Sequence, residues 1–72
     1  MTTDQKLGFI LEVIDAEDTQ GITPETLLED CPDWDSIGAL SVMSEVDDEF
    51  DVIISADEME SCKTFGDILK FF

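Results

Sequence analysis

The chain has 72 residues, of which 19 are acidic and 3 are lysine or arginine, so its formal net charge is −16. A field of this sign repels nucleic acid and anionic membrane surfaces, whose recognition needs cationic contacts to phosphate. The length allows one small domain, expected over residues 1–72, and a hydrophobic fraction of 43% argues against wholesale disorder. Because the chain has no histidine, a Ser-His-acid triad is excluded.

The first predicted helix begins at Thr2 or Thr3. Gln5 lies three residues after Thr2, which is the spacing of a capping box. The helical period places four apolar residues in one stripe, namely Leu7, Ile10, Leu11 and Ile14. We expect the helix to end between Asp15 and Asp18, where carboxylates oppose the helix dipole.

A long connection follows over residues 17–35. Its length is unusual for an undecorated loop, so we expect it to be tied down, with Leu27 and Leu28 as anchors in the core. Thr23-Pro24-Glu25 resembles a cap followed by proline at the first helical position, which favours a single helical turn near residues 24–28.

The second predicted helix spans about residues 36–50, with Ser36 or Asp35 as its N-cap. The helical period assigns one apolar side to Ala39, Leu40, Val42, Met43, Val46 and Phe50. It assigns the opposite side to Gly38, Ser41, Ser44, Glu45, Asp48 and Asp51. Ile37 falls on the polar side, so we expect an exposed apolar side chain directly after Ser36.

Two further helices are predicted after an extended, buried connection at residues 52–54. Ser55 and Glu58 have the spacing of a capping box and open a short third helix with Met59 facing inward. Thr64 caps the last helix, with Asp67 three residues later. The apolar face of this helix comprises Phe65, Ile68, Leu69 and Phe72. The predicted fold is therefore all-α.

The residues around Ser36 resemble the modification site of acyl carrier proteins. The family motif is Asp-Ser-Leu, and Asp35-Ser36-Ile37 matches it with a conservative change at the third position. Trp34 replaces the glycine usual before the motif in fatty-acid-synthesis carriers, a form we associate with free-standing specialised carriers. Chain length, helix order, acidity and residues 64–69 are also similar. The resemblance implies a small four-helix bundle with a long first loop, three longer helices and a short third helix.

What the resemblance implies for function is a carrier and not an enzyme, with no catalytic residue. A phosphopantetheinyl transferase would attach 4′-phosphopantetheine from coenzyme A to Ser36, making the chain a phosphoprotein. The arm would carry acyl or aminoacyl groups as thioesters for fatty-acid, polyketide or other specialised acyl metabolism. Expected partners are an acyl-loading ligase or acyltransferase, and a ketosynthase or another acyl-processing enzyme. An anion at Ser36 would lie at the positive end of a helix.

Partner enzymes with basic surfaces are expected to recognise Asp35, Ile37, Glu45, Asp47 and Asp48. The acidic cluster lies in the C-terminal half of its helix, where the dipole disfavours it, so local energetics do not explain the cluster. A solvated face is the default interpretation of such a cluster, and docking of cationic partners is the one that the resemblance favours.

Two uncharged positions near Ser36 depart from the family pattern. Gly38 and Ser41 stand where fatty-acid-synthesis carriers usually bear carboxylates, which hints at a dedicated partner set. The bundle is expected to shelter an aliphatic chain among Leu40, Met43, Val46, Ile54, Met59 and Ile68.

Two alternatives to an acyl carrier stay open: an acidic protein-docking module without a prosthetic group, and a peptidyl carrier protein of a nonribosomal pathway.

An EF-hand calcium site is not expected. Asp33, Asp35 and Gly38 match the first, third and sixth positions of an EF-hand loop, but Ile37 and Ser44 stand where two further ligands are needed.

The two cysteines are expected to be structural. Cys31 and Cys62 lack zinc-site spacing, so we expect two reduced, partly buried thiols. The first residues are polar and the first apolar run is interrupted by acids, so no signal peptide is predicted, and no segment is long enough for a membrane span. We expect a cytoplasmic monomer.

Overall fold

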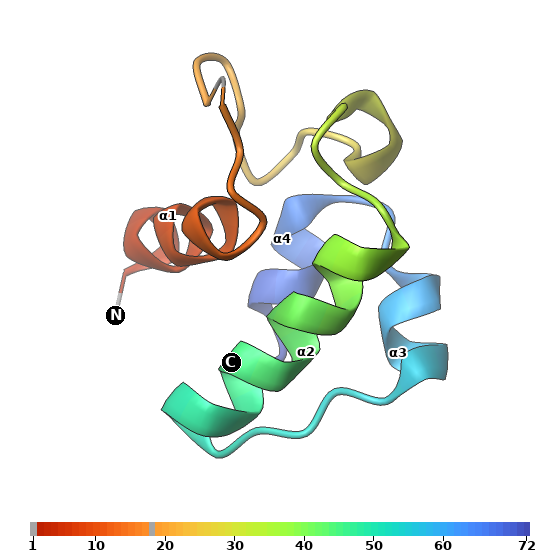
Figure 1. Cartoon of the computed structure of the whole chain (residues 1–72). Coiled ribbons are helices and arrows are strands. Elements are labelled where there is room, and N and C mark those ends of the chain that lie inside the picture. Colours follow the sequence, from red (N-terminus) through yellow and green to blue (C-terminus); the bar gives the residue numbers. More distant parts are fainter. Residues whose placement is uncertain (1, 18) are drawn as a thin grey trace.

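The computed structural model describes residues 2–17 and 19–72, and within them it contains four α-helices (Figure 1). The elements are α1 (Thr3–Val13), the 3₁₀ turn η1 (Leu28–Asp30), α2 (Ser36–Phe50), α3 (Ala56–Ser61) and α4 (Phe65–Leu69). α1 packs against both α2 and α4. The predicted all-α bundle with a long first loop is confirmed, and no strand is assigned in the described residues.

The helix starts follow the capping signals in the sequence. Three capping boxes form, between Thr2 and Gln5, Ser55 and Glu58, and Thr64 and Asp67. In each box the hydroxyl accepts the backbone N–H of the residue three positions later, and that residue's side chain accepts the N–H of the cap. A cap of this kind contributes about 1 kcal/mol. The predicted starts of α1, α3 and α4 are confirmed.

α2 spans Ser36–Phe50, as predicted, but the end of α1 and the length of α4 differ from expectation. α1 ends at Val13 with Ile14 as its C-cap, and Asp15 adopts a left-handed conformation with φ of 56°. The end thus comes before the predicted interval, of which Asp18 lies outside the described residues. α4 has five residues and is even shorter than α3, which has six. The bundle therefore has two long and two short helices.

The hydrophobic core gathers residues from every helix. The largest fully buried side chains are Phe65, Ile10, Ile68, Val42 and Val46. At one end of the bundle the rings of Phe9, Phe50 and Phe72 pack together, with centroids 5.3 Å apart for Phe9 and Phe50 and 4.9 Å apart for Phe50 and Phe72. Each ring pair of this kind stabilises the fold by about 0.5–1.5 kcal/mol beyond the contribution of the apolar area that it buries.

Two residues of α2 contradict the predicted faces. Leu40, expected in the core, is 63% exposed, and Gly38, expected on the polar side, is buried. The innermost row of the helix is Gly38, Val42 and Val46, which are spaced four residues apart. Gly38 is covered by Ile14, so the end of α1 determines which side of α2 faces inward.

The connection between α2 and α3 contains neither helix nor strand, and it is only partly buried. Ile54 is 2% exposed, whereas Ile53 is 81% exposed, which corrects the expectation that the whole segment is buried. Successive side chains of an extended chain point to opposite sides, so neighbouring residues cannot both face the core.

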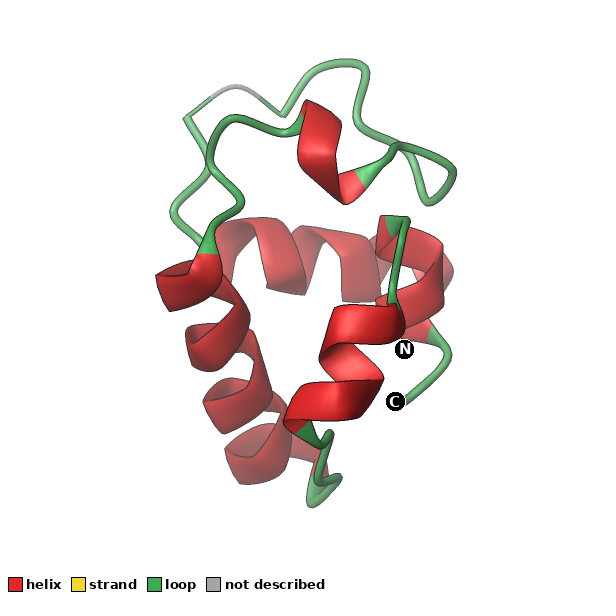
Figure 2. Cartoon of the chain, turned by 90° about the vertical axis from the view of Figure 1, so that its right-hand side faces the viewer, coloured by secondary structure: helices red, strands yellow, loops and turns green. Residues whose placement is uncertain are grey.

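The long first loop is tied to the start of α4 by backbone hydrogen bonds. The N–H groups of Leu28, Phe65 and Gly66 donate to the carbonyl oxygens of Lys63, Thr26 and Pro24 at 2.9, 3.2 and 2.7 Å. An isolated antiparallel bridge pairs Leu27 with Thr64. Figure 2 shows the loop and η1 covering one end of the bundle.

The anchors of this loop differ from the predicted pair. Leu28 is 6% exposed and Leu27 is 40% exposed, so Leu28 is the residue that enters the core. Residues 24–28 form no α-helical turn. Instead, the N–H of Thr26 donates to the carbonyl of Thr23 in a turn, and the 3₁₀ turn begins at Leu28.

Candidate functional site

Asp35 is the N-cap of α2, which leaves the neighbouring Ser36 hydroxyl uncommitted. Asp35 Oδ1 accepts the N–H of Gly38 at 2.7 Å, and Ser36 is the first helical residue. Both residues are exposed. The Ser36 hydroxyl makes no hydrogen bond to any residue that the structure describes. It is therefore open to a substituent at the positive end of a 15-residue helix.

The segment before Ser36 is held in place from both sides. Asp33 Oδ2 accepts the backbone N–H of Glu17 at 3.3 Å, which joins it to the residues after α1. The N–H of Trp34 donates to the carbonyl of Cys31 at 3.1 Å. Together with the Asp35 cap, these contacts fix the direction in which residues 33–36 enter the helix.

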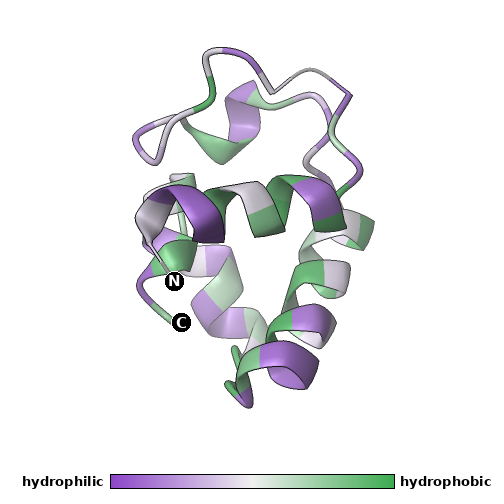
Figure 3. Ribbon diagram, turned by 90° about the vertical axis from the view of Figure 1, so that its left-hand side faces the viewer, coloured by the Kyte–Doolittle hydropathy of each residue, from purple (hydrophilic) through white to green (hydrophobic). Residues whose placement is uncertain are grey.

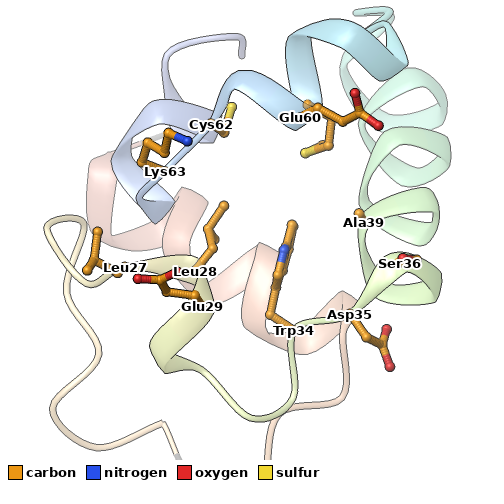
Figure 4. Close-up of a pocket in the computed structure, with 11 residues that line it drawn as sticks. Leu27, Leu28, Glu29, Trp34, Asp35, Ser36, Ala39, Glu60, Cys62 and Lys63 are labelled. Carbon is orange, nitrogen blue, oxygen red and sulfur yellow. The ribbon is translucent and has the colours of Figure 1, made fainter.

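Ser36 lies on the wall of a cleft of about 560 Å³. The cleft is formed by the loop around η1, the start of α2 and the end of α3 (Figure 4). Its apolar lining includes Leu28, Trp34, Ala39, Met59 and Cys62. Sequence reasoning did not find this cleft, because it is assembled from three segments far apart in the chain.

The residues expected to shelter an aliphatic chain do not gather at this cleft. Of the six, Met59 is the one that lines it. Val46, Ile54 and Ile68 are packed in the core and are at most 2% exposed, while Leu40 faces solvent. The cleft next to Ser36 thus lies at the loop end of the bundle, outside the core.

The five residues expected to recognise partners are all exposed, namely Asp35, Ile37, Glu45, Asp47 and Asp48. Ile37 is 75% exposed, as the helical period predicted, and Leu40 forms a second exposed apolar side chain one turn later. Along α2, the hydrophilic colour in Figure 3 lies mainly in the C-terminal half. The structure brings Ile37 close to Ser36 in the first turn and places the acids farther along the helix.

These acidic side chains are not neutralised within the fold. Among the described residues one ion pair forms, between Lys70 and Asp67 at 3.8 Å, and its lysine is 81% exposed. Exposed ion pairs of this kind contribute little to the stability of the fold. The charge on α2 is therefore available to cationic groups outside the molecule.

Cys31 and Cys62 are free cysteines, and both are buried, where partial burial was expected. The Cys62 Sγ donates to the carbonyl of Glu58 at 3.4 Å. Burial, together with the carboxylates of Asp67 and Glu58, raises the pKa of the Cys62 thiol. Near neutral pH this thiol stays protonated and is a poor nucleophile.

A family model described as "Phosphopantetheine attachment site" matches residues 7–72, which include Ser36, the cleft and all of α2 to α4. No solved structure matches the chain. None of the helices in the described residues is long and apolar enough to cross a membrane.

Proposed function

We propose, because the chain belongs to the phosphopantetheine attachment-site family, that Ser36 bears the group and that the protein is an acyl carrier protein. Members of this family carry 4′-phosphopantetheine bound covalently, and serve as carriers. The observation that supports Ser36 is its position, since an exposed hydroxyl without a hydrogen bond in the described structure opens α2.

The residues at the start of α2 fit a phosphate ester. The Asp35 carboxylate uses the N–H of Gly38, while the N–H groups of Ser36 and Ile37 have no partner among the described residues. Free N–H groups and the helix dipole favour an anion at this end. When bound, the group supplies a terminal thiol that holds acyl or aminoacyl cargo as a thioester. The role of the chain is then to present this cargo at high effective concentration to its partners.

The proposed carrier has no catalytic residue of its own. Its partners are a phosphopantetheinyl transferase, an acyl-loading ligase or acyltransferase, and a ketosynthase or another acyl-processing enzyme. We propose that their basic surfaces approach Glu45, Asp47 and Asp48 while Ile37 makes an apolar contact beside the attachment point. Charge complementarity of this kind steers encounter and fixes register. A cytoplasmic, monomeric state remains part of this proposal.

The pathway is the finer part of the proposal, and the structure changes one argument about it. Gly38 is buried against Ile14, so its lack of a carboxylate says nothing about an exposed surface. The hint of a dedicated partner set therefore rests on Ser41, which is half-buried, and on Trp34. Loading assays with a fatty-acid malonyl transferase and with an adenylating ligase test it. Efficient malonyl loading defeats the specialised pathway, and preferential aminoacyl loading favours a peptidyl carrier.

The attachment itself is tested by intact mass. The purified chain is incubated with coenzyme A and a promiscuous phosphopantetheinyl transferase. We expect a gain of one phosphopantetheine in the wild type and in Ser44→Ala, an exposed serine of the same helix, and no gain in Ser36→Ala. An unmodified wild-type chain would favour the acidic docking module without a prosthetic group.

A further inference from the structure

The indole of Trp34 stands inside the cleft that begins at Ser36. Figure 4 shows it between Leu28 on one side and Ala39 on the other. Its ring meets that of Phe65 edge to face, with centroids 5.9 Å apart and an interplanar angle of 76°. The neighbours of Trp34 are both fixed, Asp33 by the N–H of Glu17 and Asp35 by that of Gly38. The indole is therefore held at this place by its backbone as well as by packing.

The residues behind the indole are packed in the core. Phe65 is fully buried, and Leu28 and Met59 are each 6% exposed. Farther along α2, Val42 and Val46 are also fully buried. Trp34 thus lies between the cleft, which it lines, and the buried ring of Phe65.

The polar edge of the indole is available to a ligand in the cleft. Trp34 is half-buried, and its ring N–H makes no hydrogen bond to a described residue. No buried side-chain nitrogen or oxygen lacks a partner in the described structure, so this N–H is accessible to solvent. It can donate to a carbonyl oxygen of a group held near Ser36.

From this arrangement we propose that Trp34 is a specificity-determining residue that limits the cargo to short acyl or small aminoacyl groups. The arm folds back along the cleft, so that the carbonyl end of the cargo lies against the indole. The indole blocks the way past Phe65, so the distal part of a long aliphatic chain stays in water. This inference rests on the proposed attachment at Ser36 and adds the class of substrate that the site prefers.

A chain-length series tests the proposal without any partner enzyme except the loading transferase. Butyryl-, hexanoyl- and decanoyl-coenzyme A are used to load the wild type, Trp34→Ala and Trp34→Phe. Ile53→Ala serves as a matched control, because Ile53 is an exposed apolar residue that does not line the cleft. Intact mass confirms loading, and the readouts are Tm and the emission of Trp34, which is the single tryptophan of the chain.

In the wild type and in Ile53→Ala we expect the short butyryl cargo to shift Trp34 emission, and Tm to stay level from butyryl to decanoyl. In Trp34→Ala, removal of the indole opens the interior, so Tm should climb by about 5 °C or more from butyryl to decanoyl. Trp34→Phe retains a ring beside Phe65 and should respond less than Trp34→Ala.

A wild-type Tm that climbs steadily with chain length would overturn the limit set by Trp34, and so would equal responses in the wild type and Trp34→Ala. If Trp34→Ala does not fold, the wild-type series decides alone. A chain that gains no mass in any variant would instead overturn the attachment at Ser36, and with it this inference.

Discussion

The backbone N–H of Gly66 donates a 2.7 Å hydrogen bond to the carbonyl oxygen of Pro24, and this contact joins the first turn of α4 to the long loop. The two residues are distant in sequence, but their backbones are in direct contact. A Cβ on Gly66 would lie 2.9 Å from the Pro24 oxygen, which is closer than real Cβ atoms come. The loop that carries one wall of the cleft therefore requires glycine at this position.

Gly66→Ala should destabilise the protein by about 1–3 kcal/mol, because the backbone of the loop has to move away from α4. Gly8→Ala is the matched control. Gly8 is exposed within α1, and a Cβ there would have no atom within 4 Å, so the same change should stabilise by up to about 1 kcal/mol. Urea unfolding measures both. Equal effects of the two substitutions would contradict the close contact.

Salt should stabilise the chain. The net charge of −16 is concentrated on a molecule whose radius of gyration is 10.9 Å, and the described residues contain one ion pair. Screening weakens repulsion between exposed carboxylates. We expect Tm to rise by several degrees between low-salt buffer and about 0.5 M NaCl. A Tm that does not change over this range would show that repulsion between the carboxylates does not destabilise the fold appreciably.

The carboxylate of Asp67 should make stability depend on pH. Its Oδ2 accepts the N–H groups of Lys63 and Thr64 at 2.9 and 3.1 Å, and these bonds lower the pKa of Asp67 in the folded state. A group whose pKa is lower when folded stabilises above its unfolded pKa, near 3.9. That contribution is lost as the pH falls through the folded pKa.

Comparison with Asp67→Asn isolates this effect, since acid also relieves the general repulsion in both proteins. The wild type should melt at a higher temperature than Asp67→Asn at pH 7, and the gap should close as the pH falls through the pKa of Asp67 in the folded state. Thermal unfolding followed by circular dichroism over pH 2–7 gives the gap directly. If the difference in melting temperature did not depend on pH, the stabilisation by Asp67 would not depend on its negative charge.

The acidic end of α2 should speed recognition by the transferase. In Asp47→Asn/Asp48→Asn we expect kcat/KM for loading to fall about tenfold at low salt, and the difference from wild type to shrink at high salt. Glu17→Gln/Glu25→Gln removes the same charge from exposed positions in the loop and should have a smaller effect. If both double variants lose the same activity, net charge and not the α2 surface governs the encounter.

Local features of the fold could be predicted from the sequence because they depend on neighbouring residues. The three capping boxes and the exposed Ile37 follow from spacings of a few residues. Gly38 and Leu40 could not be placed in this way. The rotation of α2 is determined by its contact with Ile14 at the end of α1, and no count of apolar residues within α2 contains that information.

The candidate site shows the same division. The position of Ser36 beside a helix start could be predicted, because Asp35 and the apolar period mark it. The cleft could not, since Leu28, Trp34 and Met59 meet only when the loop binds the start of α4. Of these three residues, Trp34 is the one that the sequence points to, because it is a large aromatic residue in a polar segment directly before the motif.

Peptide-level mass spectrometry of the loaded chain tests the central claim most directly. After reaction with coenzyme A and the transferase, fragment ions assign the added group to one residue. The account predicts that the group is found on Ser36 and on no other serine or threonine. A group assigned to Ser41, Ser44 or any other residue, or a chain that remains unmodified, would contradict it.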